Sequence, residues 1–309
     1  MLKRIVAIAA VAAIALLCLG GSALAAPPAD WPKKIVFGII PTDSSANITE
    51  RFDNLVKYLE KRLGVPVEVK VATDYAGVIT GMQFKHIDLA YFGPKSYVEA
   101  AKRANAEAFV IEVSKDGSKG YYGLIITKKG SGLKSVADLK GKVWAFVDPN
   151  STSGTLVPMV HFLNDLKIDP ETYFSKVIYS GSHEASMISI KTGKIDGAST
   201  NDLDMARGEG KQWNSEKDFE IIWKSQLIPG SPMAYRKDLP VSLKKALTDA
   251  FLAYDDKAGL EMLKIKGYAP VTDKTYDAVR DLMDVQKRMK KGSSLFQVGN
   301  LKSSLPLMR

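Results

Sequence analysis

The stretch Val143-Trp144-Ala145-Phe146-Val147-Asp148-Pro149-Asn150-Ser151-Thr152-Ser153-Gly154 joins a strand pattern to a helix pattern. Residues 143–147 are a short apolar run typical of a buried strand, and residues 155–166 carry apolar side chains at helical spacing. Between them stand three consecutive hydroxyl side chains and a glycine. One hydroxyl is enough to cap a helix. The extra hydroxyls, beside the unpaired N–H groups of the first turn, therefore indicate a site for a phosphate-like anion, with capping alone as the alternative.

Short apolar runs alternate with helical patterns along the rest of the chain. We expect strands at 35–40, 67–71, 87–92, 121–127, 177–180, 195–199 and 219–223, and helices at 48–62, 96–103, 185–191, 243–254 and 276–288. The β-α-β order predicts mostly parallel sheets with helices on both faces. Because the alternation of strand and helix patterns restarts near residue 129, we predict two α/β lobes. Lobe 1 is discontinuous (26–128 and 226–309), lobe 2 (129–225) is inserted into it, and two crossing strands form a hinge.

The N-terminus has the pattern of a secretory signal peptide. Lys3 and Arg4 precede an apolar run, and Ala23-Leu24-Ala25 is a typical cleavage site. We therefore predict that residues 1–25 are removed and that the mature protein is periplasmic. The run is too short for a comfortable membrane span of about 20 residues. Cys18, the one cysteine of the chain, lies inside this segment, so the mature protein is expected to have no disulfide.

The formal net charge of the whole chain is +9, and it becomes +7 without Lys3 and Arg4. The lysines are scattered and often adjoin acidic residues, as in Lys57-Tyr58-Leu59-Glu60-Lys61-Arg62. An arginine-rich stripe with interleaved aromatic residues is not evident. We therefore expect a solvated basic surface and no nucleic-acid partner.

Polar residues follow two further predicted strands of lobe 2. In open α/β sheets, ligands bind beyond the carboxyl ends of the strands. His183 lies just after one strand pattern and before a helix pattern, and it could donate a ring N–H to an anion. Asp202 follows the strand pattern at 195–199, with Asp204 as its competitor. Because a carboxylate repels an anion unless the ligand carries a proton, Asp202 indicates a protonated oxyanion. A packing histidine and a capping aspartate remain the alternatives.

Aromatic residues of lobe 1 complete the predicted site. Tyr75 and Tyr121 are expected to donate phenolic O–H bonds across the cleft, although either could be a core or rim residue. Tyr91 and Phe92, at the end of the third strand, are weaker candidates for a wall of the site. Lysine and arginine do not stand out at the strand ends. The sequence therefore predicts binding through neutral donors and backbone dipoles.

These segments resemble the periplasmic substrate-binding proteins of phosphonate and phosphite ABC transporters. The resemblance covers most of the chain after the signal peptide and includes Phe37-Gly38-Ile39-Ile40-Pro41-Thr42, Asp74-Tyr75-Ala76-Gly77, Asp148-Pro149-Asn150-Ser151-Thr152-Ser153-Gly154, Gly181-Ser182-His183-Glu184 and Trp223-Lys224-Ser225-Gln226-Leu227-Ile228-Pro229-Gly230. It implies a type II periplasmic-binding-protein fold and a membrane permease partner. It also implies contacts to the phosphorus oxygens from Tyr75, Tyr121, Ser151, Thr152, Ser153 and His183.

The resemblance also bears on the ligand. Family members that bind aminoethylphosphonate place a carboxylate pair near the ammonium group, and Thr200-Asn201-Asp202-Leu203-Asp204 does not match that pattern cleanly. This segment is closer to members that take phosphite or methylphosphonate. We therefore expect a monomeric, cofactor-free solute-binding protein for such an anion, with aminoethylphosphonate and phosphate as alternatives.

Two other classes of protein remain open. A periplasmic sensor subunit would have the same ligand site. A hydrolase could use Ser151 or Ser153 with His183 and Asp202 as a triad. However, neither serine lies in a Gly-x-Ser-x-Gly elbow, which disfavours an enzyme.

Overall fold

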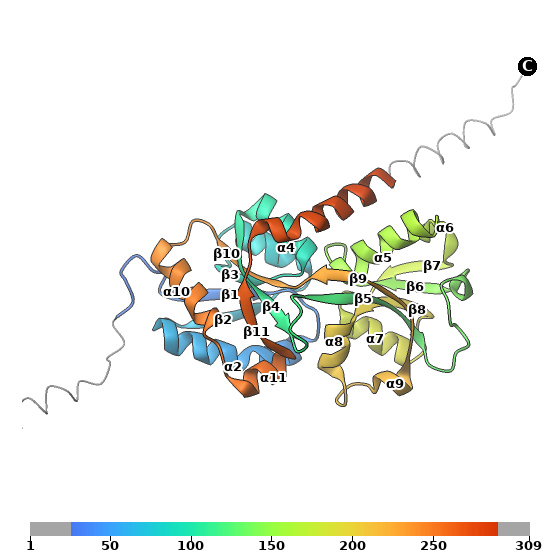
Figure 1. Cartoon of the computed structure of the whole chain (residues 1–309), viewed down its shortest axis with the longest axis horizontal. Coiled ribbons are helices and arrows are strands. Elements are labelled where there is room, and N and C mark those ends of the chain that lie inside the picture. The colour runs from blue at the N-terminus through green and yellow to red at the C-terminus, as the bar shows by residue number, and fades with distance from the viewer. Residues whose placement is uncertain (1–25, 290–309) are drawn as a thin grey trace, which may run out of the picture.

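The computed structural model describes residues 26–289. They form two α/β lobes side by side, with strands running between them (Figure 1). The predicted signal peptide, residues 1–25, lies outside the described residues, as do residues 290–309. Within the described part of the chain, no helix has the length and apolar character needed to cross a membrane.

Lobe 1 is built on a six-stranded sheet with the order β11-β4-β10-β3-β1-β2. The strands β1, β2 and β3 are parallel, whereas β10 and β11 pair antiparallel to their neighbours. Its strands are β1 (Ile35–Ile39), β2 (Val67–Val71), β3 (Leu89–Tyr91), β4 (Ala106–Ser114), β10 (Pro232–Arg236) and β11 (Ile265–Pro270). Its helices are α2 (Ser45–Leu63), α3 (Tyr75–Gln83), α4 (Pro94–Ala104), α10 (Val241–Leu252), α11 (Lys257–Leu263) and a last helix at 277–289.

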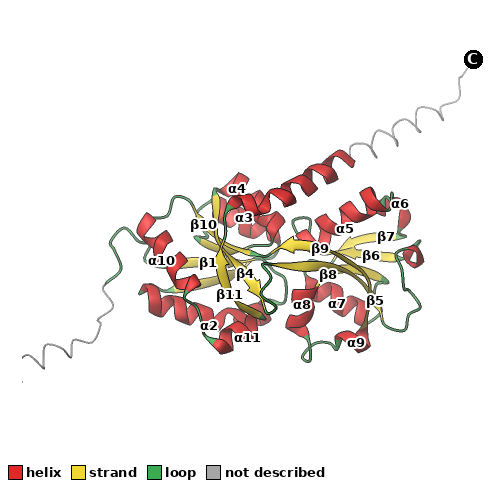
Figure 2. Cartoon of the chain, in the orientation of Figure 1, coloured by secondary structure: helices red, strands yellow, loops and turns green. Residues whose placement is uncertain are grey.

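Lobe 2 is built on a five-stranded sheet with the order β7-β6-β8-β5-β9, and helices cover both faces (Figure 2). Its strands are β5 (Gly120–Lys128), β6 (Val143–Phe146), β7 (Lys176–Tyr179), β8 (Gly197–Asn201) and β9 (Phe219–Pro229). Its helices are η2 (Thr152–Leu156), α5 (Val157–Val160), η3 (His161–Asp165), α6 (Pro170–Tyr173), α7 (His183–Lys191), α8 (Asp202–Gly208) and α9 (Ser215–Asp218).

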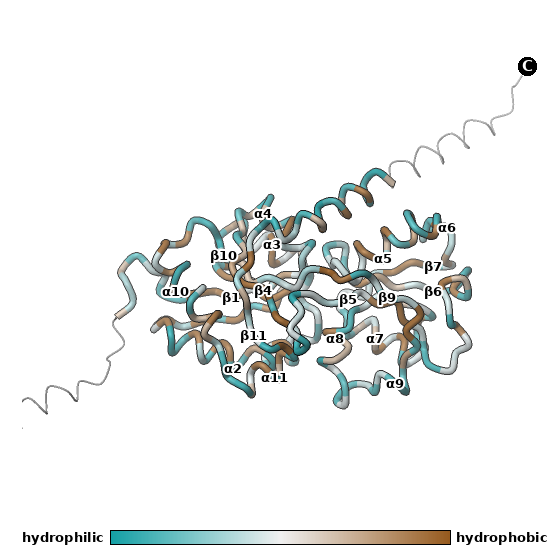
Figure 3. The backbone as a smooth tube through the Cα atoms, in the orientation of Figure 1, coloured by the Kyte–Doolittle hydropathy of each residue, from teal (hydrophilic) through white to brown (hydrophobic). Residues whose placement is uncertain are grey.

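The strand side chains explain why lobe 2 has helices on both faces. Successive residues of a strand point to opposite sides of the sheet. On β6, Trp144 and Phe146 pack in one apolar cluster, and Ala145 packs in the cluster on the other face. Both faces are therefore apolar and both must be covered. In Figure 3 the hydrophobic segments accordingly concentrate along the strands in the middle of each lobe.

The two crossings between the lobes lie elsewhere than the sequence indicates. The sequence pattern places them after residues 128 and 225, but β5 and β9 pair over their whole length within lobe 2. The crossings are therefore the segments 115–119 and 230–231. They remain hydrogen-bonded to each other, since Gly230 N–H donates to the carbonyl of Lys119 at 2.9 Å. The apolar pattern of a strand does not say which sheet it joins, and this caused the error.

Two further differences concern single elements. Strands β4 and β11 were not expected, and they extend the lobe 1 sheet at one edge. The helix expected at 155–166 begins earlier and is divided into a π-helical turn, a short α-helix and a second π-helical turn. The first π turn carries the hydroxyl side chains, and π turns inside helices often occur at functional sites. Otherwise the predicted two-lobed α/β architecture is confirmed.

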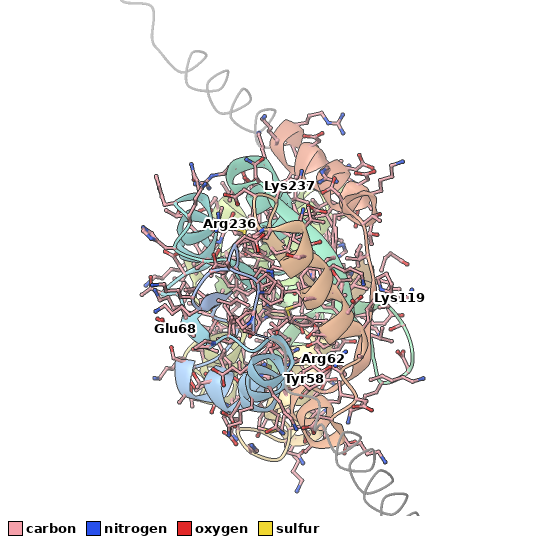
Figure 4. All side chains as sticks on the ribbon, turned by 90° about the vertical axis from the view of Figure 1, so that its left-hand side faces the viewer. Tyr58, Arg62, Glu68, Lys119, Arg236 and Lys237 are labelled. Atoms are coloured by element: carbon pink, nitrogen blue, oxygen red, sulfur yellow. The ribbon has the colours of Figure 1, made fainter. Side chains whose placement is uncertain are left out.

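The basic surface is dispersed, as expected. Figure 4 looks at the molecule from the end of lobe 1, and Arg62, Lys119 and Lys237 lie well apart in this view. All three are exposed. Many surface lysines have an acidic neighbour, such as Lys57 beside Asp53 at 2.6 Å. Exposed pairs of this kind contribute little to stability, but they break up a continuous positive surface.

Candidate functional site

A small cavity lies where the two lobes meet. Its volume is about 20 Å³, and one water molecule needs roughly 10–15 Å³ of such space. The cavity therefore has room for one or two water molecules. Lobe 1 contributes Ile40, Thr42, Tyr75, Tyr91, Gly93 and the hinge residue Ser231; lobe 2 contributes Tyr121, Ser151, Thr152, Ser153, His183, Asn201, Leu203, Asp204 and Arg207.

The helix start at Ser151 forms one wall, as predicted from the sequence. Ser151 caps the helix, because its Oγ accepts the N–H of Gly154 at 3.1 Å. A Cβ on Gly154 would lie only 2.4 Å from Val147, at the end of the preceding strand. Glycine therefore allows the turn to pack directly on the sheet. This places the first backbone N–H groups of the helix beside the cavity.

The three hydroxyls are arranged as donors. Each oxygen already accepts a hydrogen bond from the protein: Ser151 from Gly154 N–H, Thr152 from Lys95 N–H at 2.9 Å, and Ser153 from the Asn201 amide at 3.2 Å. Since a hydroxyl has one hydrogen of its own, that hydrogen remains to donate elsewhere. Three O–H donors on one turn suit an anion with several oxygens.

The two predicted tyrosines meet at the cavity, but they come from different lobes. Tyr75 starts α3 of lobe 1, and its hydroxyl interacts with Ser151. Tyr121 lies on β5 of lobe 2 and interacts with Ser153 and Thr152, so its predicted place in lobe 1 is wrong. Burial raises the pKa of both phenols, and Asp204 adds to the effect on Tyr75. Both therefore stay protonated and can donate.

His183 begins α7 and faces the helix start. Its Nε2 lies 3.5 Å from Ser151 Oγ, and its Nδ1 lies 3.2 Å from Thr200 Oγ1. Burial lowers the pKa of His183, and the charge of Asp204 only partly opposes this shift. The ring is therefore neutral near pH 7 and has one N–H to donate. His183 thus lines the cavity between the lobes, where the sequence pattern placed it.

The structure corrects the choice between the two aspartates. Asp202 accepts the backbone N–H of Tyr122 at 2.9 Å and lines a separate outer groove of about 750 Å³ beside the hinge. Asp204 lines the cavity instead. Its Oδ2 accepts from the Asn201 amide at 2.8 Å. Burial alone would raise the pKa of Asp204, but His183, Arg207 and Arg51 lower it below its ordinary value. The cavity thus contains one ionised acceptor.

Arg207 is the most important cavity residue that the sequence did not indicate. Its guanidinium lies 3.0 Å from Asp204 and 3.1 Å from Glu112, and its side chain is 3% exposed. The expectation that neutral donors alone form the site is therefore wrong. A signal was present: Arg207 stands three residues after Asp204 on one helix, a spacing that puts both on the same face.

The two weaker aromatic candidates have different positions. Tyr91 lines the cavity, and its hydroxyl lies 3.1 Å from Glu112 and 3.3 Å from Arg207. Burial raises the pKa of Tyr91 to about 12 despite the opposing charge of Arg207. Phe92 is fully buried in the apolar core of lobe 1 instead.

Further contacts hold the lobes together next to the cavity. Glu184 follows His183 on α7 of lobe 2 and accepts the backbone N–H of Ser44 at 2.7 Å, at the start of α2 in lobe 1. The Asn47 amide donates both to Glu184 at 3.2 Å and to Asp43 at 2.9 Å. The two carboxyl groups are thus close neighbours. Burial, the hydrogen bond with Asp43 and the charge of Asp43 raise the pKa of Glu184 to about 7.

This contact predicts pH-dependent closure. The ordinary value for the glutamate is 4.5, to which Glu184 should return when the lobes separate. Because the pKa of Glu184 is higher in the closed form, protonation of Glu184 favours closure. This contribution to the free energy of closure is complete below about pH 4.5 and is lost as the pH rises through about 7. Ligand affinity should therefore fall more between pH 5 and pH 8 in the wild type than in Glu184→Gln, whose amide does not ionise in this range.

Calorimetric titration at several pH values measures both proteins. The ionisation of the ligand affects them equally, so it cancels in the comparison. Glu171→Gln, an exposed change on α6, is the matched control and should behave as the wild type. Identical pH dependence in the wild type and Glu184→Gln would contradict a role for Glu184 in closure.

Comparison with known proteins agrees with this geometry. The family model described as "ABC transporter, phosphonate, periplasmic substrate-binding protein" matches residues 37–276. The chain is 36% identical over 246 residues to the phosphonates-binding periplasmic protein of Escherichia coli, covering 77% of this chain and 71% of that one. It is 32% identical over 307 residues to the phosphate-import protein PhnD of Mycolicibacterium smegmatis, covering 92% and 95%.

A solved structure shows the same fold. PhnD1 from Prochlorococcus marinus, solved in complex with methylphosphonate, superposes with a TM-score of 0.74 at 25% identity, covering 81% of this chain and 97% of that one. The two-lobed architecture is thus that of the type II periplasmic-binding proteins.

Proposed function

The chain belongs to the family of periplasmic substrate-binding proteins of phosphonate ABC transporters, and we propose that its ligand is a small, singly protonated phosphorus oxyanion such as methylphosphonate or phosphite. The protein is the solute-binding component of an importer of this type. The single observation that carries the choice of ligand is the composition of the cavity. Many donors surround it, together with one ionised acceptor, Asp204.

The donors fit the charged oxygens of such an anion. The hydroxyls of Ser151, Thr152 and Ser153 donate from one side, and Tyr75, Tyr121 and His183 lie close to them. Bonds from these groups to an ionised oxygen are short and strong. The first turn of the helix adds backbone N–H groups and a favourable dipole.

Asp204 discriminates between protonated and unprotonated forms of the ligand. Its lowered pKa keeps it ionised near neutrality, so it repels an oxygen without a proton and accepts a bond from P–OH. The second ionisation of phosphate esters occurs near pH 6, so singly protonated forms of related acids are present near neutrality. Sulfate has no such proton and should be rejected.

The remaining lining limits the size and polarity of the fourth substituent. The cavity of about 20 Å³ favours the smallest phosphorus oxyanions, and Ile40 and Leu203 provide apolar surface. A methyl group or a P–H hydrogen suits such a wall. Phosphate would place a fourth oxygen there, and a buried polar group without a partner costs about 1–3 kcal/mol. Phosphate therefore remains the weaker alternative, although one relative is named as a phosphate-import protein.

The geometry does not favour the hydrolase alternative. Ser151 Oγ accepts from a backbone N–H, and Asp202 is held by Tyr122 outside the cavity, so the suggested triad is not assembled. We further propose that residues 1–25 are a cleaved signal peptide and that the mature monomer delivers its ligand to a membrane permease.

Calorimetric titration of the chain without residues 1–25 tests the choice of ligand. Methylphosphonate and phosphite should bind most tightly. Phosphate should bind at least about tenfold more weakly, the equivalent of 1.4 kcal/mol, and sulfate should bind weakest. Binding of none of these anions, or equal binding of sulfate and methylphosphonate, would contradict the proposal.

A further inference from the structure

The guanidinium of Arg207 is enclosed by a complete set of cation partners. Its nitrogens lie 3.0 Å from Asp204 Oδ1, 3.1 Å from Glu112 Oε1, 3.3 Å from the Tyr91 hydroxyl and 3.3 Å from the Leu263 carbonyl. The guanidinium carbon also lies 5.9 Å from the centre of the Tyr91 ring, within the range of a cation–π contact. Two carboxylates and an aromatic ring around one buried position make a site for positive charge.

This cation site adjoins the ligand cavity. Arg207, Asp204 and Tyr91 all line the cavity, and Glu112 lies directly behind the guanidinium, with 3% of its side chain exposed. A ligand substituent that extended toward Glu112 would therefore meet the guanidinium first.

We propose that Arg207 is a specificity-determining residue whose side chain occupies the position that the ammonium group of an aminoalkylphosphonate would need. The protein thereby selects phosphorus oxyanions without an amine. This inference rests on the proposed function and narrows its ligand class. Two effects act together: the fixed positive charge repels a second cation, and the guanidinium fills the space.

Arg207 is well held in this position. Its partners Glu112, Tyr91 and Leu263 belong to β4, β3 and α11 of lobe 1, whereas Arg207 itself is on α8 of lobe 2. Displacing it in the closed form would leave Glu112 and Asp204 buried without their main cation, which is strongly unfavourable. Arg51, whose guanidinium lies 3.9 Å from the same Asp204 oxygen, adds to the repulsion of an amine.

The same geometry predicts what removal of Arg207 would create. In Arg207→Ala the carboxyl groups of Asp204 and Glu112 and the Tyr91 ring would remain beside the cavity. These groups would form a site for a ligand ammonium group. The variant should therefore gain affinity for aminoethylphosphonate relative to methylphosphonate.

Titration of three proteins with these two ligands tests the assignment. The wild type should bind methylphosphonate at least about 100-fold more tightly than aminoethylphosphonate, corresponding to about 2.7 kcal/mol. In Arg207→Ala this ratio should fall by at least about 30-fold, roughly 2 kcal/mol. Arg280→Ala is the matched control, since Arg280 pairs with Asp273 and Asp277 away from the cavity, and it should keep the wild-type ratio.

Folding of the variant is checked independently. If Arg207→Ala does not fold alone, aminoethylphosphonate should restore a cooperative thermal transition, whereas methylphosphonate should not; no rescue would overturn the assignment. A folded variant with an unchanged ratio, or a wild type that binds both ligands equally, would also overturn it. A wild type that binds neither ligand would instead contradict the proposed function on which the assignment rests.

Discussion

Replacing all three hydroxyls of the helix start, as Ser151→Ala, Thr152→Val and Ser153→Ala together, should weaken methylphosphonate binding by at least about a thousandfold. Each side chain lines the cavity and has its hydroxyl hydrogen available for an anion. A hydrogen bond to a charged group contributes about 1.5–3 kcal/mol, so three of them exceed about 4 kcal/mol, which corresponds to that loss of affinity. Calorimetric titration measures it.

Thr155→Val is the matched control for this change. Thr155 belongs to the same helix start, but its hydroxyl donates to the Asp148 carbonyl at 2.7 Å instead of facing the cavity. Its loss should lower thermal stability and leave affinity within about threefold, less than the 1.4 kcal/mol of a tenfold change. The triple variant should also melt earlier, because Ser151 caps the helix, at a cost of about 1 kcal/mol. A triple variant that binds within tenfold of the wild type would contradict the role of the hydroxyls.

Asp204→Asn should be the most damaging single carboxylate change, with affinity for methylphosphonate falling at least about 30-fold, or about 2 kcal/mol. The asparagine cannot accept the P–OH bond as an ion, and it removes the negative charge that faces Arg207 at 3.0 Å. Asp202→Asn is the control. It alters a contact with the Tyr122 backbone outside the cavity and should leave affinity nearly unchanged.

A second ligand separates the binding role of Asp204 from a structural one. If Asp204 rejects unprotonated anions, the preference for methylphosphonate over sulfate should shrink in Asp204→Asn. Simple loss of packing would weaken the binding of both ligands alike. An unchanged preference would therefore contradict the proposal that Asp204 recognises the P–OH proton. Breaking a buried ion pair also costs about 3–5 kcal/mol of stability, so thermal unfolding should be followed in parallel.

Local sequence patterns predicted most of the architecture because burial of apolar runs and capping of helix ends depend on residues close together in the sequence. Apolar runs such as residues 143–147 must be buried, and they became strands in the middle of covered sheets. The hydroxyl turn was identified because three hydroxyls and a glycine at a strand-to-helix junction exceed what a single helix cap requires. It lies in the cavity as expected.

The error over the aspartates has a geometric cause. The strand expected at 195–199 runs from Gly197 to Asn201, and α8 begins directly at Asp202. A helix turns by 100° per residue, so residues two apart point to nearly opposite sides. Asp202 and Asp204 therefore face the outer groove and the cavity, respectively. A displacement of two residues in the expected strand end was enough to select the wrong one.

Arg207 was missed because its role depends on distant parts of the chain. Glu112 lies 95 positions away and Tyr91 lies 116 positions away, in the other lobe. Helical spacing links Arg207 to Asp204, but a single sequence does not show that β3, β4 and α8 converge when the lobes close.

A crystal structure of the protein with methylphosphonate tests the central claim most directly. The phosphorus atom should lie in the cavity, with its charged oxygens within hydrogen-bonding distance of the Ser151, Thr152 and Ser153 hydroxyls. The P–OH should face Asp204, and Arg207 should remain paired with Glu112. Methylphosphonate bound in the outer groove beside Asp202, or bound in the cavity without contact to the hydroxyl turn, would contradict it.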